Sequence, residues 1–178
     1  MKSIKSISMA LLFVAAMFSV PTMAQSKSAP HLTDPEIASV AVVANQVDIE
    51  YGKVALLKSK NATTRKFAQT MIDDHTAIIA QAVALAKKLG VTPKDNAVSQ
   101  SLMDGAKKMK TTLNSKKGKA FDAAYINNEV SYHEAVISTV KDVLIPQTQN
   151  AELKDLLQSV VPLLEHHLEM AKMAQAKL

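Results

Sequence analysis

Three histidines and one glutamate stand out as residues that could do chemistry: Glu50, His75, His133 and His167. Each is a single polar residue in an otherwise apolar stripe, and the four lie in four separate stretches of the chain. Imidazole and carboxylate together suit Zn, Fe, Mn, Ni or Cu(II). Three His and one Glu can complete a metal shell without cysteine, and the chain has no cysteine. The pattern predicts one divalent transition metal ion bound by these four residues.

Neighbouring residues are expected to orient the imidazoles. The candidates are Asp74, which adjoins His75, Glu129, one turn before His133, and Tyr125. The same residues fit a second interpretation, a buried polar network that fixes the packing and holds no metal. Both interpretations stay open at this stage.

A third, weaker interpretation involves copper. Met71 and Met170 lie one turn from His75 and His167. Thioethers bind Cu(I), but methionine on an apolar stripe is more often core filler.

Helix signals divide the chain into the elements that must position these residues. Asp34-Pro35-Glu36 is typical of a helix start with Asp34 as the cap, and Asn61 and Asn150 are expected to cap later helices. Strand-like alternation is absent from the sequence. The predicted helices span about 34–60, 61–90, 97–113, 119–144 (ending before Pro146) and 150 to the C-terminus, with a kink at Pro162.

The four long helices place the candidate ligands at one height. Glu50 lies 11 residues before Asn61 and His75 lies 14 after it, whereas His133 and His167 lie 17 before and 17 after Asn150. At about 1.5 Å per residue, the mismatch within each pair is less than about one turn. The four side chains are therefore expected to meet near the middle of the molecule.

Short links join the first two long helices and the last two, which predicts two antiparallel hairpins. A long crossover with a short extra helix joins the hairpins. We therefore expect an all-α, ferritin-like four-helix bundle. An up-and-down bundle with an extra helix is the alternative.

The N-terminus has the features of a secretory signal peptide, predicted over residues 1–24. Lys2 and Lys5 precede an apolar stretch, 7–20, and Thr22-Met23-Ala24 suits cleavage. A flexible leader is expected over 25–33 and the folded domain over 34–178. The protein should then be periplasmic or secreted, with no integral membrane span after cleavage. An uncleaved anchor is the alternative, although 14 apolar residues fall short of the roughly 20 that a span needs.

Lysines between residues 107 and 119 form a basic stretch without interleaved aromatic residues. Stacking on aromatic side chains is the usual means of holding exposed bases, so nucleic acid is not an expected partner. The lysines are then either a solvated face of the protein or a contact surface for anionic lipid or polysaccharide. The sequence identifies no protein partner.

Several ordered segments resemble the bacterial secreted proteins of domain-of-unknown-function family 4142: residues 50–55, 67–71, 73–76, 121–125, His133 and 162–168. The resemblance implies a ferritin-like bundle in the cell envelope and no established activity. It implies motif roles for Glu50, Asp74, His75, Phe121, Asp122, Tyr125, His133, Pro162 and His167.

Di-iron bundle enzymes carry Glu-x-x-His on two helices. Here Ile72 and Leu164 stand three residues before His75 and His167, which argues against ferroxidase or oxygenase chemistry. A nucleophile elbow, a cofactor loop and paired carboxylates are also missing. We therefore expect an exported metal-binding bundle, and the alternative is a non-enzymatic envelope stress or interaction protein with a structural polar core.

Overall fold

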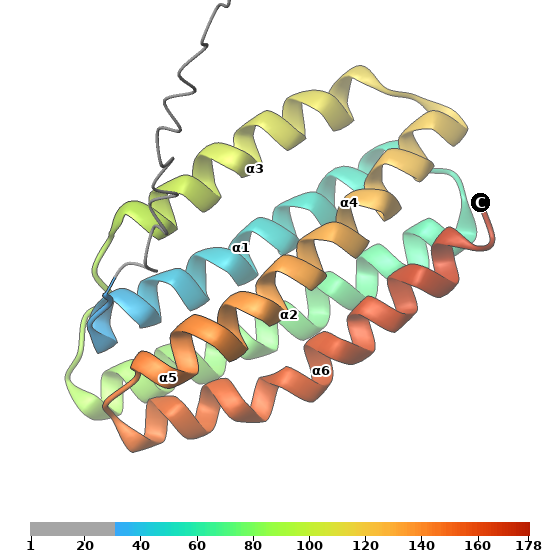
Figure 1. Ribbon diagram of the computed structural model, residues 1–178. Helices are drawn as coiled ribbons and strands as arrows, with labels where there is room; N and C mark the ends of the chain where they lie inside the picture. Colours follow the sequence, from blue (N-terminus) through green and yellow to red (C-terminus); the bar gives the residue numbers. More distant parts are fainter. Residues whose placement is uncertain (1–30) are drawn as a thin grey trace, which may run out of the picture.

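The computed structural model describes residues 31–178, and every regular element in that range is helical (Figure 1). The predicted signal peptide therefore lies outside the described residues. The elements are α1 (Asp34–Lys58), α2 (Ala62–Leu89), α3 (Ala97–Ser115), α4 (Gly118–Thr139), the π-helix η1 (Val140–Leu144), α5 (Ile145–Gln147) and α6 (Ala151–Gln175). The all-α prediction is confirmed.

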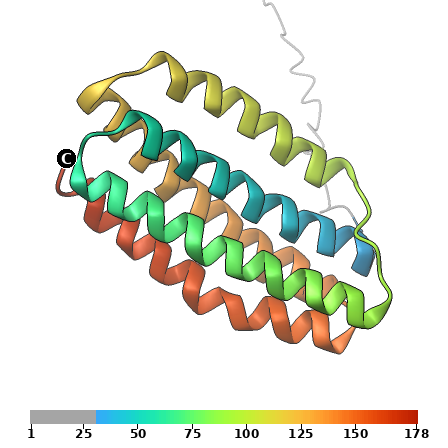
Figure 2. The ribbon, with the colours of Figure 1, turned by 180° about the vertical axis from the view of Figure 1, so that it is seen from behind.

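The four long helices α1, α2, α4 and α6 lie side by side, and α3 packs outside them against α1 (Figures 1 and 2). The α1–α2 pair and the α4–α6 pair are each antiparallel. Helices α2 and α4 run in the same direction, so the chain must travel back along the molecule between them. Helix α3 makes that return, as the extra helix predicted in the crossover.

The predicted caps of two helices are present. Asn61 accepts a hydrogen bond from Thr64 N at 3.0 Å, and Asn150 accepts one from Leu153 N at 3.0 Å. Gly90 ends α2 with φ = 64°, a left-handed conformation that glycine adopts without steric cost.

The predicted cap of α1 was wrong. Thr33 is the N-cap, and its backbone N–H and hydroxyl both donate to Glu36. The carboxylate of Asp34 accepts instead from Gln149 N at 2.9 Å and Asn150 N at 2.8 Å. It thereby ties the start of α1 to the turn before α6.

The end of α4 also differs from the prediction that the helix stops before Pro146. The chain passes through the π-turn η1, in which Ile145 N donates to Val140 O, and α5 then includes Pro146. Proline cannot donate to the preceding turn and crowds it. The wider π-turn lets the chain stay helical up to Gln147.

Two apolar clusters fill the interior on either side of its middle. The first contains Tyr51, Phe67, Met71, Phe121 and Tyr125. The second contains Ile37, Val40, Leu144, Leu153 and Leu157, and also Leu32, so packing begins before the predicted domain start at residue 34. On α2, α4 and α6, one histidine lies between the residues of the two clusters.

A glycine in α1 allows a close contact between α1 and α2. A Cβ added at Gly52 would lie 2.9 Å from Ile72 Cγ1 and 3.0 Å from the carbonyl oxygen of Ala68. Gly105 in α3 is a matched control, because a Cβ there would meet nothing within 4 Å.

We expect Gly52→Ala to lower the free energy of unfolding. Overpacking costs about 1–3 kcal/mol, which outweighs the gain of about 1 kcal/mol in helix propensity. Gly105→Ala should raise the free energy of unfolding by about 0.5–1 kcal/mol. Urea unfolding of both variants measures these changes. A stability gain in both would show that the α1–α2 contact has room for a methyl group.

Candidate metal centre

Three histidines from three helices meet in the interior: His75 of α2, His133 of α4 and His167 of α6. Their ring centroids are 5.1 to 5.7 Å apart, and all three side chains are buried. One nitrogen from each ring lies within 4.8 Å of the other two. The structure therefore brings together the three histidines that the sequence singled out.

The carboxylate at this point belongs to Asp48, not to Glu50. Asp48 is fully buried, and its Oδ2 lies 3.2 Å from His75 Nε2 and 3.4 Å from His133 Nε2. The side chain of Glu50 is 50% exposed and pairs with Lys110 of α3 at 2.7 Å. Glu50 thus lies outside the cluster.

The helical phase of α1 explains this error. The apolar stripe that contains Glu50 passes through Val47, Val54 and Leu57, but the buried face runs through Val47, Tyr51 and Ala55. Leu57 is 86% exposed. Two residues correspond to about 200° around a helix, so Asp48 and Glu50 point to different sides. The run 43, 47, 51, 55 would have indicated the correct face.

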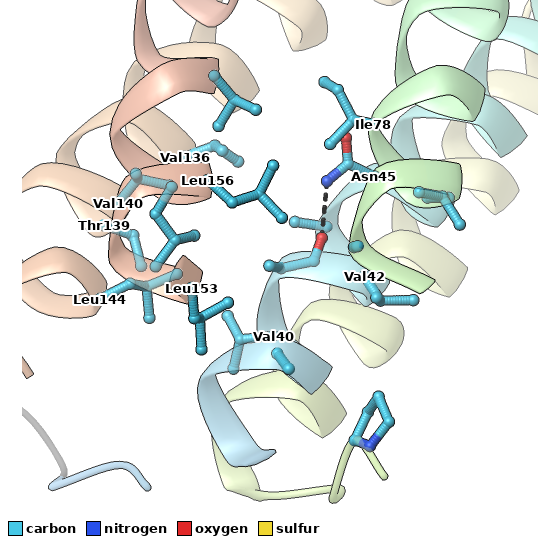
Figure 3. Close-up of a pocket in the computed structure, with 18 of the residues that line it drawn as sticks. Val40, Val42, Asn45, Ile78, Val136, Thr139, Val140, Leu144, Leu153 and Leu156 are labelled. Atoms are coloured by element: carbon cyan, nitrogen blue, oxygen red, sulfur yellow. Dashed lines mark hydrogen bonds between the residues drawn. The ribbon is translucent and has the colours of Figure 1, made fainter. Parts of the chain in front are cut away.

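Two imidazoles are fixed by contacts at their outer nitrogen. Asn45 donates from Nδ2 to Ala41 O, drawn as the dashed line in Figure 3, which leaves its Oδ1 as an acceptor for His75 Nδ1 at 2.6 Å. His133 Nδ1 lies 3.0 Å from the backbone oxygen of Glu129. Both rings therefore carry the proton on Nδ1 and direct the lone pair of Nε2 inward. The role of Asn45 was not predicted.

The third imidazole, that of His167, makes its outer contact through Nε2 and not through Nδ1. His167 Nε2 lies 2.9 Å from Asp74 Oδ2, so its Nδ1 is the inner nitrogen. Asp74 was expected to act near its neighbour His75, but it reaches across to α6. All three inner nitrogens and both oxygens of Asp48 are buried without a hydrogen-bond partner.

The charge states in the cluster favour metal binding. Burial lowers the pKa of His133, and burial lowers the pKa of His167 to about 4, so both rings are neutral near pH 7. Burial raises the pKa of Asp48, but the charge and the hydrogen bond of the adjacent His75, with smaller effects of His133 and His167, lower that pKa overall. Neutral imidazole and ionised carboxylate are the forms that bind metals.

Glu129 is a second buried carboxyl group beside the cluster. One of its oxygens lies within 4.8 Å of ligand atoms of Asp48 and His133. Burial, reinforced by the charge of Asp48, raises the pKa of Glu129 well above its ordinary range. Glu129 therefore keeps its proton to a higher pH than an ordinary glutamate does. Its backbone carbonyl, rather than its carboxyl group, makes the hydrogen bond to His133.

The remaining candidates belong to the apolar core. The ring of Tyr125 stacks on Phe121 and meets Phe67 edge-on, with centroids 6.3 and 6.1 Å apart. Its buried hydroxyl has no hydrogen-bond partner. Met71 is completely buried in the first apolar cluster, the position of a core residue.

The spacing of the inner atoms fits a small metal ion. Ligands at 2.0–2.1 Å from a tetrahedral ion are about 3.3–3.4 Å apart. The distances from Asp48 to His75 and His133, 3.2 and 3.4 Å, agree with this spacing. Both contacts are made by Oδ2 of Asp48, so this oxygen lies near two of the three inner nitrogens. Each ring also has the outer contact that usually accompanies metal-binding histidine.

The fold and the site define a class: an all-helical protein with a buried cluster of three histidines and one aspartate. The chain belongs to the family described as domain of unknown function DUF4142, which matches residues 19–174. The resemblance seen in the sequence is thus confirmed. Neither a curated protein nor a solved structure was found to match. Among residues 31–178, no helix has the length and apolarity to cross a membrane.

Proposed function

We propose that this protein is an exported, non-enzymatic metal-binding bundle that holds one divalent transition metal ion through Asp48, His75, His133 and His167. The observation that carries the proposal is that three inner imidazole nitrogens lie close together, with the carboxylate of Asp48 beside two of them, and that these atoms are buried without partners. A buried polar atom without a partner costs about 1–3 kcal/mol. One bound ion would satisfy all four residues at once.

A ferritin-like bundle is the arrangement that we propose for the helices. Two antiparallel hairpins joined by a long crossover, with the polar cluster at mid-height, support it. We also propose that residues 1–24 direct export and are removed. A mature chain that begins at Gln25 is the expected result of N-terminal sequencing, and an intact Met1 in the exported protein would contradict it.

A structural polar network is the second candidate, and one contact favours it. Each ring nitrogen of His75 faces an oxygen atom: Nδ1 faces Asn45 Oδ1, and Nε2 faces Asp48 Oδ2. If both nitrogens carried a proton, His75 could donate a hydrogen bond to each oxygen. This second proton would leave the inner nitrogens of His133 and His167 unpartnered. The network therefore accounts for half of the cluster.

Metal stoichiometry tests the proposal. Chelator-treated protein is dialysed against Zn, Mn, Fe(II), Ni or Cu(II), and bound metal is measured by elemental analysis. We expect one equivalent of at least one of these metals, lost in His167→Ala and kept in His166→Ala. His166 is the exposed neighbour of His167 on α6 and serves as the control. No stoichiometric metal with any of the five ions would favour the structural network.

The contact from Asp74 to His167 gives a further prediction. Asp74→Ala should weaken metal affinity by about 10–100-fold, because it frees the ring to rotate and to change tautomer. Asp74→Asn should restore part of the affinity, since its amide oxygen can accept the same hydrogen bond. The visible absorption spectrum of bound Co(II) reports the change in ligand geometry.

Asp73→Ala is the matched control, since Asp73 is exposed and bonds only to Gln69 in the described structure. Equal affinities for Asp73→Ala and Asp74→Ala would contradict a positioning role for Asp74.

A further inference from the structure

A cavity of about 370 Å³ lies between the two hairpins, directly beside the histidine cluster. In Figure 3, Val136, Leu153 and Leu156 line one side of it, and Val40 and Ile78 line the other. The volume falls within the range of small-molecule sites, roughly 300–1,000 Å³. Neither the apolar core nor the metal centre requires a space of this size.

The cavity extends along the helix axes. Its lining on α1 extends from Asp34 to Asp48, a distance of about 21 Å at 1.5 Å per residue. Its volume of about 370 Å³ lies along that length. An extended hydrocarbon chain fits this shape better than a fused ring system.

The polar groups of the lining lie at its two ends, and the walls between them are almost entirely aliphatic. At the outer end, Asp34 and Asn150 are engaged in hydrogen bonds with backbone N–H groups. At the inner end, Asp48, His75 and His133 have buried atoms without partners. Only the inner end therefore offers free polar groups to a ligand.

We propose that the cavity binds the hydrocarbon chain of a long-chain monocarboxylic acid, with the carboxylate at the inner end beside the metal ion. This inference rests on the proposed function, because the metal supplies the positive charge. A divalent ion held by one carboxylate and three neutral imidazoles has a net charge of +1, which one acid group neutralises. A four-coordinate zinc ion can expand to five ligands, as some catalytic zinc sites do in the transition state.

Isothermal titration with dodecanoate, octanoate and dodecanol tests the proposal on zinc-loaded and metal-free protein. Dodecanoate should bind the zinc-loaded form and bind at least about tenfold more weakly without zinc. Removal of each methylene should weaken binding by about fourfold. Dodecanol lacks the charge and should bind about equally to both forms, more weakly than dodecanoate binds the zinc-loaded form.

A variant in which a larger side chain fills the cavity is the structural control. Ala82 of α2 lines the cavity, whereas Ala84, two residues on, is exposed and outside it. Ala82→Phe should weaken dodecanoate binding at least about tenfold and leave the zinc stoichiometry unchanged. Ala84→Phe should change neither. Ala86→Phe, nearer the outer end, is the second filled variant if Ala82→Phe does not fold.

The outcomes separate this proposal from the proposed function. Zinc binding without dodecanoate binding would overturn the acid site alone. Equally tight binding of dodecanol and dodecanoate to the zinc-loaded form would overturn the carboxylate assignment. The protein could bind no metal and still bind dodecanoate in a way that Ala82→Phe blocks. That result would support the hydrocarbon site in the cavity and overturn the metal centre. If neither zinc nor dodecanoate bound, both would be overturned.

Discussion

Asp48→Asn is expected to lower the affinity for zinc by at least about 100-fold, while Glu50→Gln should leave it unchanged within about twofold. Loss of a group that only orients a ligand costs about 10–100-fold, and loss of a charged ligand should cost more. Glu50 pairs with Lys110 outside the cluster, so its substitution removes only an exposed ion pair. Competition with a chromophoric chelator measures both affinities.

The two α1 acids form a strict test because they are two residues apart on one helix. Asparagine keeps the shape of Asp48 and removes only its charge, which limits the damage to packing. Circular dichroism of both variants checks that the helices remain. A loss of zinc affinity in Glu50→Gln with none in Asp48→Asn would contradict the assignment of the carboxylate.

Metal binding should raise the melting temperature by about 8–16 °C at a free metal concentration near 1,000 times the dissociation constant. A ligand at that excess stabilises the folded state by about 4.1 kcal/mol. For domains of about 150 residues, each kcal/mol raises the melting temperature by about 2–4 °C. Differential scanning calorimetry with and without metal measures the shift.

The shift should disappear with a chelator and should be absent in His167→Ala. His166→Ala should keep it in full, because the side chain of His166 is exposed. An identical melting temperature for wild-type protein in saturating metal and in chelator would argue for the structural network.

The helices and the histidines could be predicted because local signals define them. Asn61, Gly90 and Asn150 act through backbone geometry that depends only on near neighbours. Each histidine also interrupts a clear apolar stripe, so its inward direction follows from helical periodicity. These signals place His75, His133 and His167 at one height without knowledge of the packing.

The carboxylate could not be identified in the same way. Helix α1 contacts α2, α3 and α4, so it has apolar residues on several sides. Two different apolar stripes can therefore be drawn along it, and only one of them is the buried face. The hydrogen bonds of His75 with Asn45 and of His167 with Asp74 depend on how neighbouring helices are rotated about their axes. That rotation is set by tertiary packing at sites such as Gly52, which sequence periodicity does not describe.

The four proposed ligands are divided evenly between the hairpins. Asp48 and His75 belong to α1 and α2, whereas His133 and His167 belong to α4 and α6. The chain has no cysteine, and therefore no disulfide can join the two halves. A metal ion at this position would act as a reversible cross-link, and separation of the hairpins would require it to dissociate first. The lifetime of the folded protein would then depend on how slowly the ion leaves.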